Sequence, residues 1–256
     1  ESLPQLGVVL FDSALARVDW ILLGIYSTIS ITAEYSFAYK FFELSKLPLL
    51  ILAPVLLTRF SKLFGQNDQP VETEKQKSIQ QFFNIEIFIS MLIPIFMVSV
   101  WSGLIDWVTD GKYGAVNEMT YTILAICVPL HFVINLFWTM AFVQKQLKTT
   151  MYITIGVSLF NLIANIVLIP LYASVGAAIA FLLGTLIQFF CYYFLVKKQR
   201  MNIRLKSFLI LIFVAIASLL TFKILLSNSY LIAVCSIVTY IVAAFFLKLI
   251  SFKKLI

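Results

Sequence analysis

Long apolar runs, separated by short polar stretches, recur along the whole chain. Eight of them are close to the roughly 20 residues that a helix needs to cross a bilayer. A membrane barrel strand would be half as long and would alternate in polarity, whereas a stretch such as FLILIFVAIASLLTF is apolar on every side. The pattern predicts an all-α integral membrane protein with eight transmembrane helices, at about residues 4–26, 35–58, 82–105, 119–141, 151–170, 176–196, 207–226 and 231–250.

The composition supports this class and narrows the chemistry. With 61% hydrophobic and 12% charged residues in 256, the chain carries more apolar surface than one water-soluble core can bury. Cys127, Cys191 and Cys235 all fall inside apolar runs without paired spacing. This pattern favours packing over a disulfide framework or a zinc site, and we expect no metal and no cofactor.

Positive charge is distributed unevenly between the two sets of connecting loops, which predicts the orientation of the chain. Since the Lys- and Arg-rich loops of a membrane protein stay in the cytoplasm, both ends of this segment are expected there. The opposite loops carry only Lys112. The pI of about 9.3 is therefore a property of one membrane face and no indication of nucleic-acid binding. The basic loop residues are Arg59, Lys62, Lys75, Lys77, Lys145, Lys148, Lys197, Lys198, Arg200, Arg204, Lys206, Lys248, Lys253 and Lys254.

Charged residues also occur inside the expected spans, first in FDSALARVDWILLGIYS. Asp12 and Asp19 are seven residues apart and share a helix face, while Arg17 lies roughly 160° from Asp19 around the axis. Each charge near the bilayer centre costs about 3 kcal/mol on insertion scales. Because the three residues cannot simply pair with one another, they need interior partners, water or a ligand.

The second span places Lys40, Glu43 and Lys46 at three-residue intervals. This spacing allows local ion pairs, and the two lysine side chains could also extend toward the membrane surface. Lys223 lies close to a helix end and is expected to extend toward the membrane surface.

Polar side chains form stripes on two further spans. Such stripes face other helices or a watery path, and the sequence leaves these alternatives open. His131, the only histidine, is either a proton carrier or a structural residue. The stripes consist of Thr154, Ser158, Asn161 and Asn165 in one span and of Cys127, His131, Asn135 and Thr139 in the other.

Two segments of the chain resemble a known family. ARVDWILLGIYSTISITAEYSFAYKFFELSKLPLLILAPVLLTRFSKLF and FNLIANIVLIPLYASVGAAIAFLLGTLIQFFCYYFLVKK are similar to the C-terminal half of polysaccharide-export flippases of the multidrug/oligosaccharidyl-lipid/polysaccharide (MOP) superfamily. Ala173 stands where these flippases usually have a glycine.

The resemblance implies a two-lobed transporter of fourteen helices rather than an enzyme. Residues 1–200 would form its six-helix C-terminal lobe and residues 201–256 two additional helices, and the N-terminal lobe would be missing. The chain begins at Glu1 without an initiator Met, which also suggests a fragment. The implied cargo is an oligosaccharide on polyprenyl pyrophosphate, flipped across the bacterial inner membrane during polysaccharide or O-antigen export.

The polar residues inside the expected spans and the family resemblance together give the candidate site residues. The candidates for substrate binding are Arg17, Lys40, Lys46, Asn161 and Asn165, and those for charge balance or ion coupling are Asp12, Asp19, Glu43 and His131. An Arg guanidinium can hold phosphate oxygens with two hydrogen bonds, which suits a pyrophosphate. The alternatives are a multidrug or cation antiporter of the same superfamily, a membrane-embedded polysaccharide polymerase or glycosyltransferase, and a scaffold or channel subunit.

Overall fold

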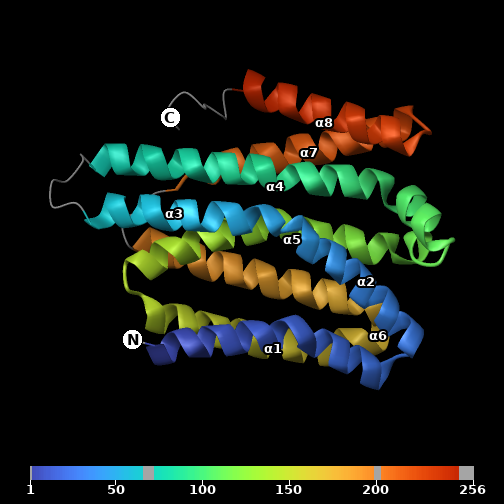
Figure 1. Ribbon diagram of the computed structural model, residues 1–256, viewed down its shortest axis with the longest axis horizontal. Coiled ribbons are helices and arrows are strands. Elements are labelled where there is room, and N and C mark those ends of the chain that lie inside the picture. Colours follow the sequence, from blue (N-terminus) through green and yellow to red (C-terminus); the bar gives the residue numbers. More distant parts are fainter. Residues whose placement is uncertain (1, 66–71, 199–202, 248–256) are drawn as a thin grey trace. The chain divides into compact units, whose positions relative to one another are not determined.

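The computed structural model describes residues 2–65, 72–198 and 203–247, and the described chain is helical throughout (Figure 1). Each of the eight apolar runs lies in a helix where the structure describes it, so the predicted all-α membrane fold is confirmed. The helices are α1 (Ser2–Tyr26), α2 (Ile29–Ser45), α3 (Leu47–Gly65), α4 (Glu72–Thr109), α5 (Gly114–Val143), α6 (Leu147–Lys198), α7 (Lys206–Leu225) and α8 (Ser229–Phe246).

Helix bounds and apolar runs differ at two places. The run at 35–58 is divided between α2 and α3, which meet at Lys46, whereas the two runs at 151–170 and 176–196 share α6. By length and apolarity, six helical stretches of the described chain could cross a membrane, with α2 and α3 taken together and α6 taken as one. The 52 residues of α6 are more than twice the roughly 20 that one crossing needs.

Helix α6 folds back on itself at Ala173. This residue has φ +50° and ψ −125°, which interrupts the helical geometry. Just after this turn the two halves of α6 lie close together: a Cβ added to Gly176 would lie 2.2 Å from the backbone oxygen of Leu168. Further along, a Cβ on Gly184 would lie 3.4 Å from Nδ2 of Asn161. The two halves of α6 therefore form an antiparallel helical hairpin.

The chain divides into two compact units. Unit 1 comprises residues 1–66 and 119–200, and unit 2 comprises residues 67–118 and 201–256. In unit 1, α1 packs along α6 and α2 packs against α1, α3 and α6. In unit 2, α4 packs against both α7 and α8. The division into a lobe at 1–200 and an extra pair at 201–256 stays a prediction, and the compact units group α4 with that pair.

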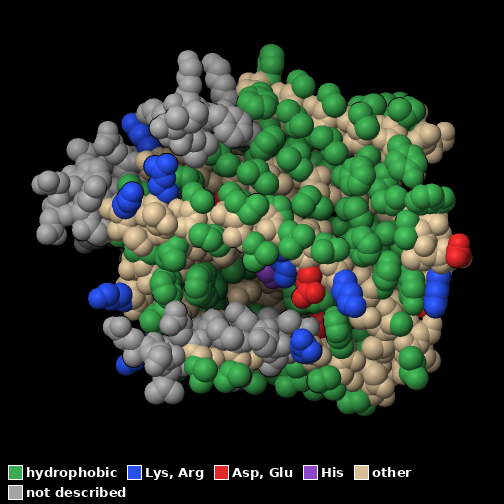
Figure 2. Space-filling model, in the orientation of Figure 1, with side chains coloured by type: hydrophobic (Ala, Val, Ile, Leu, Met, Phe, Trp, Pro, Cys, Tyr) green, Lys and Arg blue, Asp and Glu red, His purple; other side chains and the backbone are tan. Residues whose placement is uncertain are grey.

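Large apolar side chains are exposed on both units. Ile29, Ile224 and Phe246 are each more than 80% exposed, at 89%, 84% and 86%. Hydrophobic side chains also cover much of the face drawn in Figure 2. In water such a surface would be an aggregation liability, whereas in a bilayer it faces lipid tails. The chain is therefore a multi-pass membrane protein.

Candidate functional site

Asp19 and Arg17 lie on different sides of α1, as their spacing predicts. Asp19 is fully buried, and its Oδ2 accepts a hydrogen bond from the Tyr35 hydroxyl of α2 at 2.5 Å. Arg17 is exposed and makes no hydrogen bond or ion pair with a described residue. The side chain of Asp12 lies outside the described residues. In the described part of the chain, Asp19 is thus bonded to a phenol and does not pair with Arg17.

The sequence analysis missed Tyr35 as the partner of Asp19. A signal was present, because EYSFAYKFF places Tyr35 and Tyr39 one helical turn apart in the neighbouring span. Tyr39 contacts Trp20 edge to face, with ring centroids 5.9 Å apart. A phenol in an apolar span needs an acceptor, and a buried carboxylate needs a donor.

Lys40 and Glu43 of α2 do not form the local ion pair that their spacing allows. Lys40 and Glu43 are exposed, and neither makes a hydrogen bond or ion pair with a described residue. The Lys46 ammonium lies 4.3 Å from the centroid of the Phe42 ring, a cation–π contact. Arg17 and Lys40 thus supply exposed positive charge at α1 and α2 of unit 1, whereas Lys46 is half-buried.

His131 of α5 is held between aromatic rings. Its ring stacks on Phe181 with centroids 5.6 Å apart and meets the edge of Phe42 at 5.3 Å. Its Nδ1 lies 2.9 Å from the Cys127 backbone oxygen. Figure 2 shows the histidine in purple with blue Lys or Arg and red Asp or Glu side chains beside it. These contacts fix the ring in place and connect it through Phe42 to Lys46.

Asn161 and Asn165 lie inside the α6 hairpin. Both are buried, and Nδ2 of Asn165 donates to Oδ1 of Asn161 at 2.8 Å and to its backbone oxygen at 3.0 Å. Thr154 on the same stripe is also buried, and Gly184 packs over Asn161. The stripe faces the interior, so a cargo does not reach these amides in this conformation.

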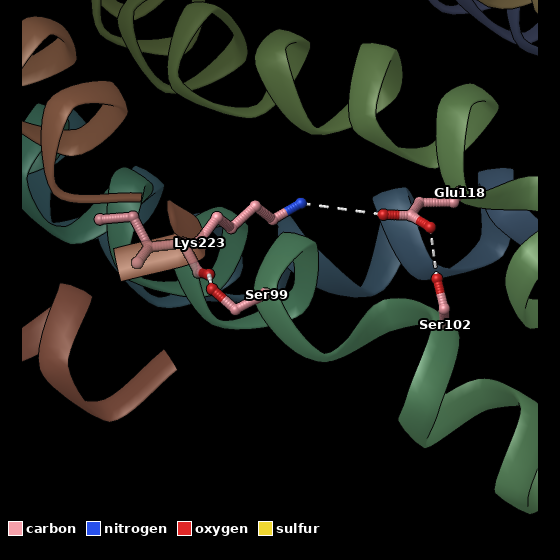
Figure 3. A network of polar contacts seen from close by, with 5 residues as sticks. Ser99, Ser102, Glu118 and Lys223 are labelled. Atoms are coloured by element: carbon pink, nitrogen blue, oxygen red, sulfur yellow. Dashed lines mark hydrogen bonds and ion pairs between the residues drawn. The ribbon is translucent and has the colours of Figure 1, made fainter. Parts of the chain in front are cut away.

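A second polar cluster lies in unit 2, where α4, α5 and α7 approach one another (Figure 3). Nζ of Lys223 lies 3.7 Å from Oε1 of Glu118, whose other oxygen accepts a hydrogen bond from Ser102 at 2.5 Å. Lys223 therefore pairs with an acid of another helix, where the sequence suggested only an extended side chain. The lysine and glutamate side chains are 40% and 45% exposed, so the pair is partly solvated.

Metal ligands do not cluster in the described part of the chain. No group of three or more His, Cys, Asp or Glu side chains among its residues could hold a metal ion. The arrangement in unit 1 offers exposed cationic groups at helix surfaces, a fixed imidazole and a buried acid bonded to a phenol. Of these groups, the exposed cations can bind an anion by charge and hydrogen bonding.

Comparison with known proteins gives a likeness in fold rather than in sequence. No family model and no curated protein matches the sequence. Among solved structures, the fold is similar to that of the lipid II flippase MurJ in an inward closed conformation, with a TM-score of 0.72 and 18% identical residues. The match covers 94% of this chain and 52% of MurJ. The chain thus has a MurJ-like fold and spans about half the length of that protein.

Proposed function

We propose that this chain is half of a membrane flippase that moves a polyprenyl-pyrophosphate-linked oligosaccharide across the bacterial inner membrane for polysaccharide export. The observation that carries the proposal is the likeness to the lipid II flippase MurJ over 94% of the chain. The family resemblance of its sequence to MOP-superfamily polysaccharide flippases supports the same class. The other half of the transporter would be an N-terminal lobe of similar size.

Exposed cations on α1 and α2 support an anionic cargo. Arg17 and Lys40 are exposed, lie in expected membrane spans and have no acid partner among the described residues. Such residues are costly in a membrane and are typical of a substrate path. We propose that Arg17 grips the pyrophosphate, that Lys40 and Lys46 add positive charge, and that Glu43, Asp12 and Asp19 balance it.

The test is export of polysaccharide by the complete transporter carrying changes at Arg17. Arg17→Ala removes both the charge and the planar fork, so export is expected to be lost while the protein still folds. Arg17→Lys keeps the charge and should restore part of the export. Arg59→Ala is the matched control, since Arg59 is also exposed but lies beyond the expected span.

Normal export by a well-expressed Arg17→Ala protein would contradict the cargo-binding role. Loss of folded protein in that variant would assign Arg17 a structural role instead. If purified protein bound cationic drugs and ignored lipid pyrophosphates, the antiporter alternative would replace the flippase. Both termini are proposed to lie in the cytoplasm, on the basis of the loop charges.

A further inference from the structure

Glu86 of α4 is a buried acid without a partner. The residue is 2% exposed, and neither carboxyl oxygen has a hydrogen-bond partner among the described residues. Other acids of unit 2 differ in this respect. Asp106 accepts hydrogen bonds from the backbone N–H groups of Gly114 and Ala115, and Glu118 binds Ser102 and Lys223. Glu86 thus differs from Asp106 and Glu118 in having a buried carboxyl group without a described partner, and it lies inside an expected span.

Residues on either side of Glu86 in α4 contact the other helices of unit 2. Three residues before it, Phe83 contacts Phe208 of α7 with centroids 6.5 Å apart, and two residues after it, Phe88 stacks on Tyr240 of α8 at 5.5 Å. Aromatic contacts to both neighbouring helices therefore bracket the position of Glu86 along α4. In this unit α4 packs on both α7 and α8.

The titratable groups that these helices carry do not reach the carboxyl group. None of them forms a hydrogen bond or ion pair with Glu86 in the described structure. The Tyr240 hydroxyl instead donates to the Phe88 backbone oxygen at 3.4 Å, and Lys223 pairs with Glu118. Among the side chains that the structure describes on these helices, the other titratable ones are Lys206 and Lys223 on α7, Tyr230, Cys235 and Tyr240 on α8, and Lys77 and Asp106 on α4.

Burial without a hydrogen-bond partner raises the free energy of a carboxylate far more than that of the protonated, neutral acid. A carboxylate that leaves water without a partner costs several kcal/mol, whereas the neutral acid costs far less. We propose that Glu86 is a proton-binding site, occupied while α4 packs on α7 and α8 and emptied when that packing opens to water. In this proposal the proton is the ligand, and the packing of α4 on α7 and α8 depends on its binding.

This site would couple a proton to the conformational cycle of the transporter, and that consequence rests on the proposed flippase function. Proton binding itself does not depend on transport. The two ideas can therefore fail separately: an export assay tests the function, and measurements on the folded chain test Glu86.

The first measurement is infrared spectroscopy of the full chain in lipid vesicles at neutral pH. A protonated carboxyl group absorbs as a C=O stretch that a carboxylate lacks. Wild type is expected to show a component of this band that Glu86→Gln loses and Glu118→Gln retains. Glu118 is the matched control because it is an acid of the same unit with partners and solvent access. Equal bands in wild type and Glu86→Gln would overturn the proposal.

The second measurement is thermal unfolding as a function of pH. If the folded chain binds one more proton than the unfolded chain, stability must fall as pH rises. The unfolding temperature of wild type should decrease as the pH is raised above about 5, and Glu86→Gln, which mimics the neutral acid, should reduce that slope. Glu118→Gln should leave the slope unchanged.

Three results would overturn the assignment. A slope that Glu86→Gln does not change would exclude Glu86 as the proton-binding group. Failure of Glu86→Gln to fold would mean that the site requires the carboxylate. A midpoint that depends on sodium concentration but not on pH would make the ligand a monovalent cation rather than a proton.

Discussion

At the scale of single residues, the turn of the α6 hairpin depends on Ala173 and Gly176. The backbone of Ala173 has φ +50°, in the left-handed half of conformational space where side chains other than that of glycine are strained. The flippases that the sequence resembles usually have a glycine there, and a positive φ is the conformation that favours glycine. Position 176 requires glycine for a different reason, which is that there is no room for a Cβ beside Leu168.

Replacing Ala173 by glycine is expected to stabilise the protein by about 1 kcal/mol, because glycine accepts a positive φ without strain. Thermal unfolding in detergent measures the change. Ala180→Gly is the matched control: Ala180 is buried in regular helix, and a glycine there should destabilise by about 1 kcal/mol. A destabilised Ala173→Gly protein would show that the strain is absent.

Replacing Gly176 by alanine is expected to destabilise the hairpin strongly, by about 1–3 kcal/mol, as overpacking does. The new Cβ would lie 2.2 Å from a backbone oxygen, which only a backbone shift can relieve. Gly156→Ala serves as the control, because a Cβ at Gly156 meets nothing within 4 Å. Equal unfolding midpoints for the two variants would refute the close approach.

At the scale of helices, contacts between polar side chains join neighbouring helices of the apolar chain. Tyr35 joins α2 to α1 through Asp19, and Lys223 joins α7 to α5 through Glu118. The two contacts differ in environment, since the first is fully buried and the second is partly solvated. They should therefore differ in energy, because water screens charges and competes for hydrogen bonds.

Tyr35→Phe removes the donor and leaves the Asp19 carboxyl buried without it. The expected loss is about 1–3 kcal/mol, the cost of an unsatisfied buried polar group. Chemical denaturation in micelles measures the loss. Tyr39→Phe is the matched control, since Tyr39 is also buried and its hydroxyl bonds no described residue. If both variants unfold alike, the Tyr35 contact contributes nothing to stability.

Lys223→Ala should cost no more than about 1 kcal/mol, as exposed ion pairs usually do. Glu118→Ala should cost more, because it also removes the acceptor of the Ser102 hydroxyl. Denaturation of both single variants and of the double variant separates the pair from the hydrogen bond. A larger loss for Lys223→Ala than for Glu118→Ala would reverse this ranking.

At the scale of the whole molecule, the distribution of positive charge predicts which loops face the cytoplasm. Single cysteines at Lys112 and Asn228 should react with an impermeant reagent from outside intact cells, and one at Lys148 should not. All three positions are exposed. Asn117 on the same outer side is unsuitable because it is fully buried. Protection of Lys112 together with labelling of Lys148 would invert the topology.

The sequence by itself determined the properties that depend on one segment at a time. Span length and apolarity identify a membrane helix, because each crossing must satisfy its own backbone hydrogen bonds. Helical periodicity likewise placed Arg17 and Asp19 on different sides of α1 and put Asn161 and Asn165 on one buried face. The candidate cations of α1 and α2 came from the same local reasoning.

Only the tertiary structure decided which groups meet. Periodicity gives the direction of a side chain and not the helix that lies opposite, so Tyr35 was not foreseen for Asp19, nor Glu118 for Lys223. The grouping of α4 with α7 and α8 is equally non-local. Glu86 is the clearest case: the sequence shows only an acid inside an expected span, and the folded chain shows that both of its carboxyl oxygens are buried without a described partner.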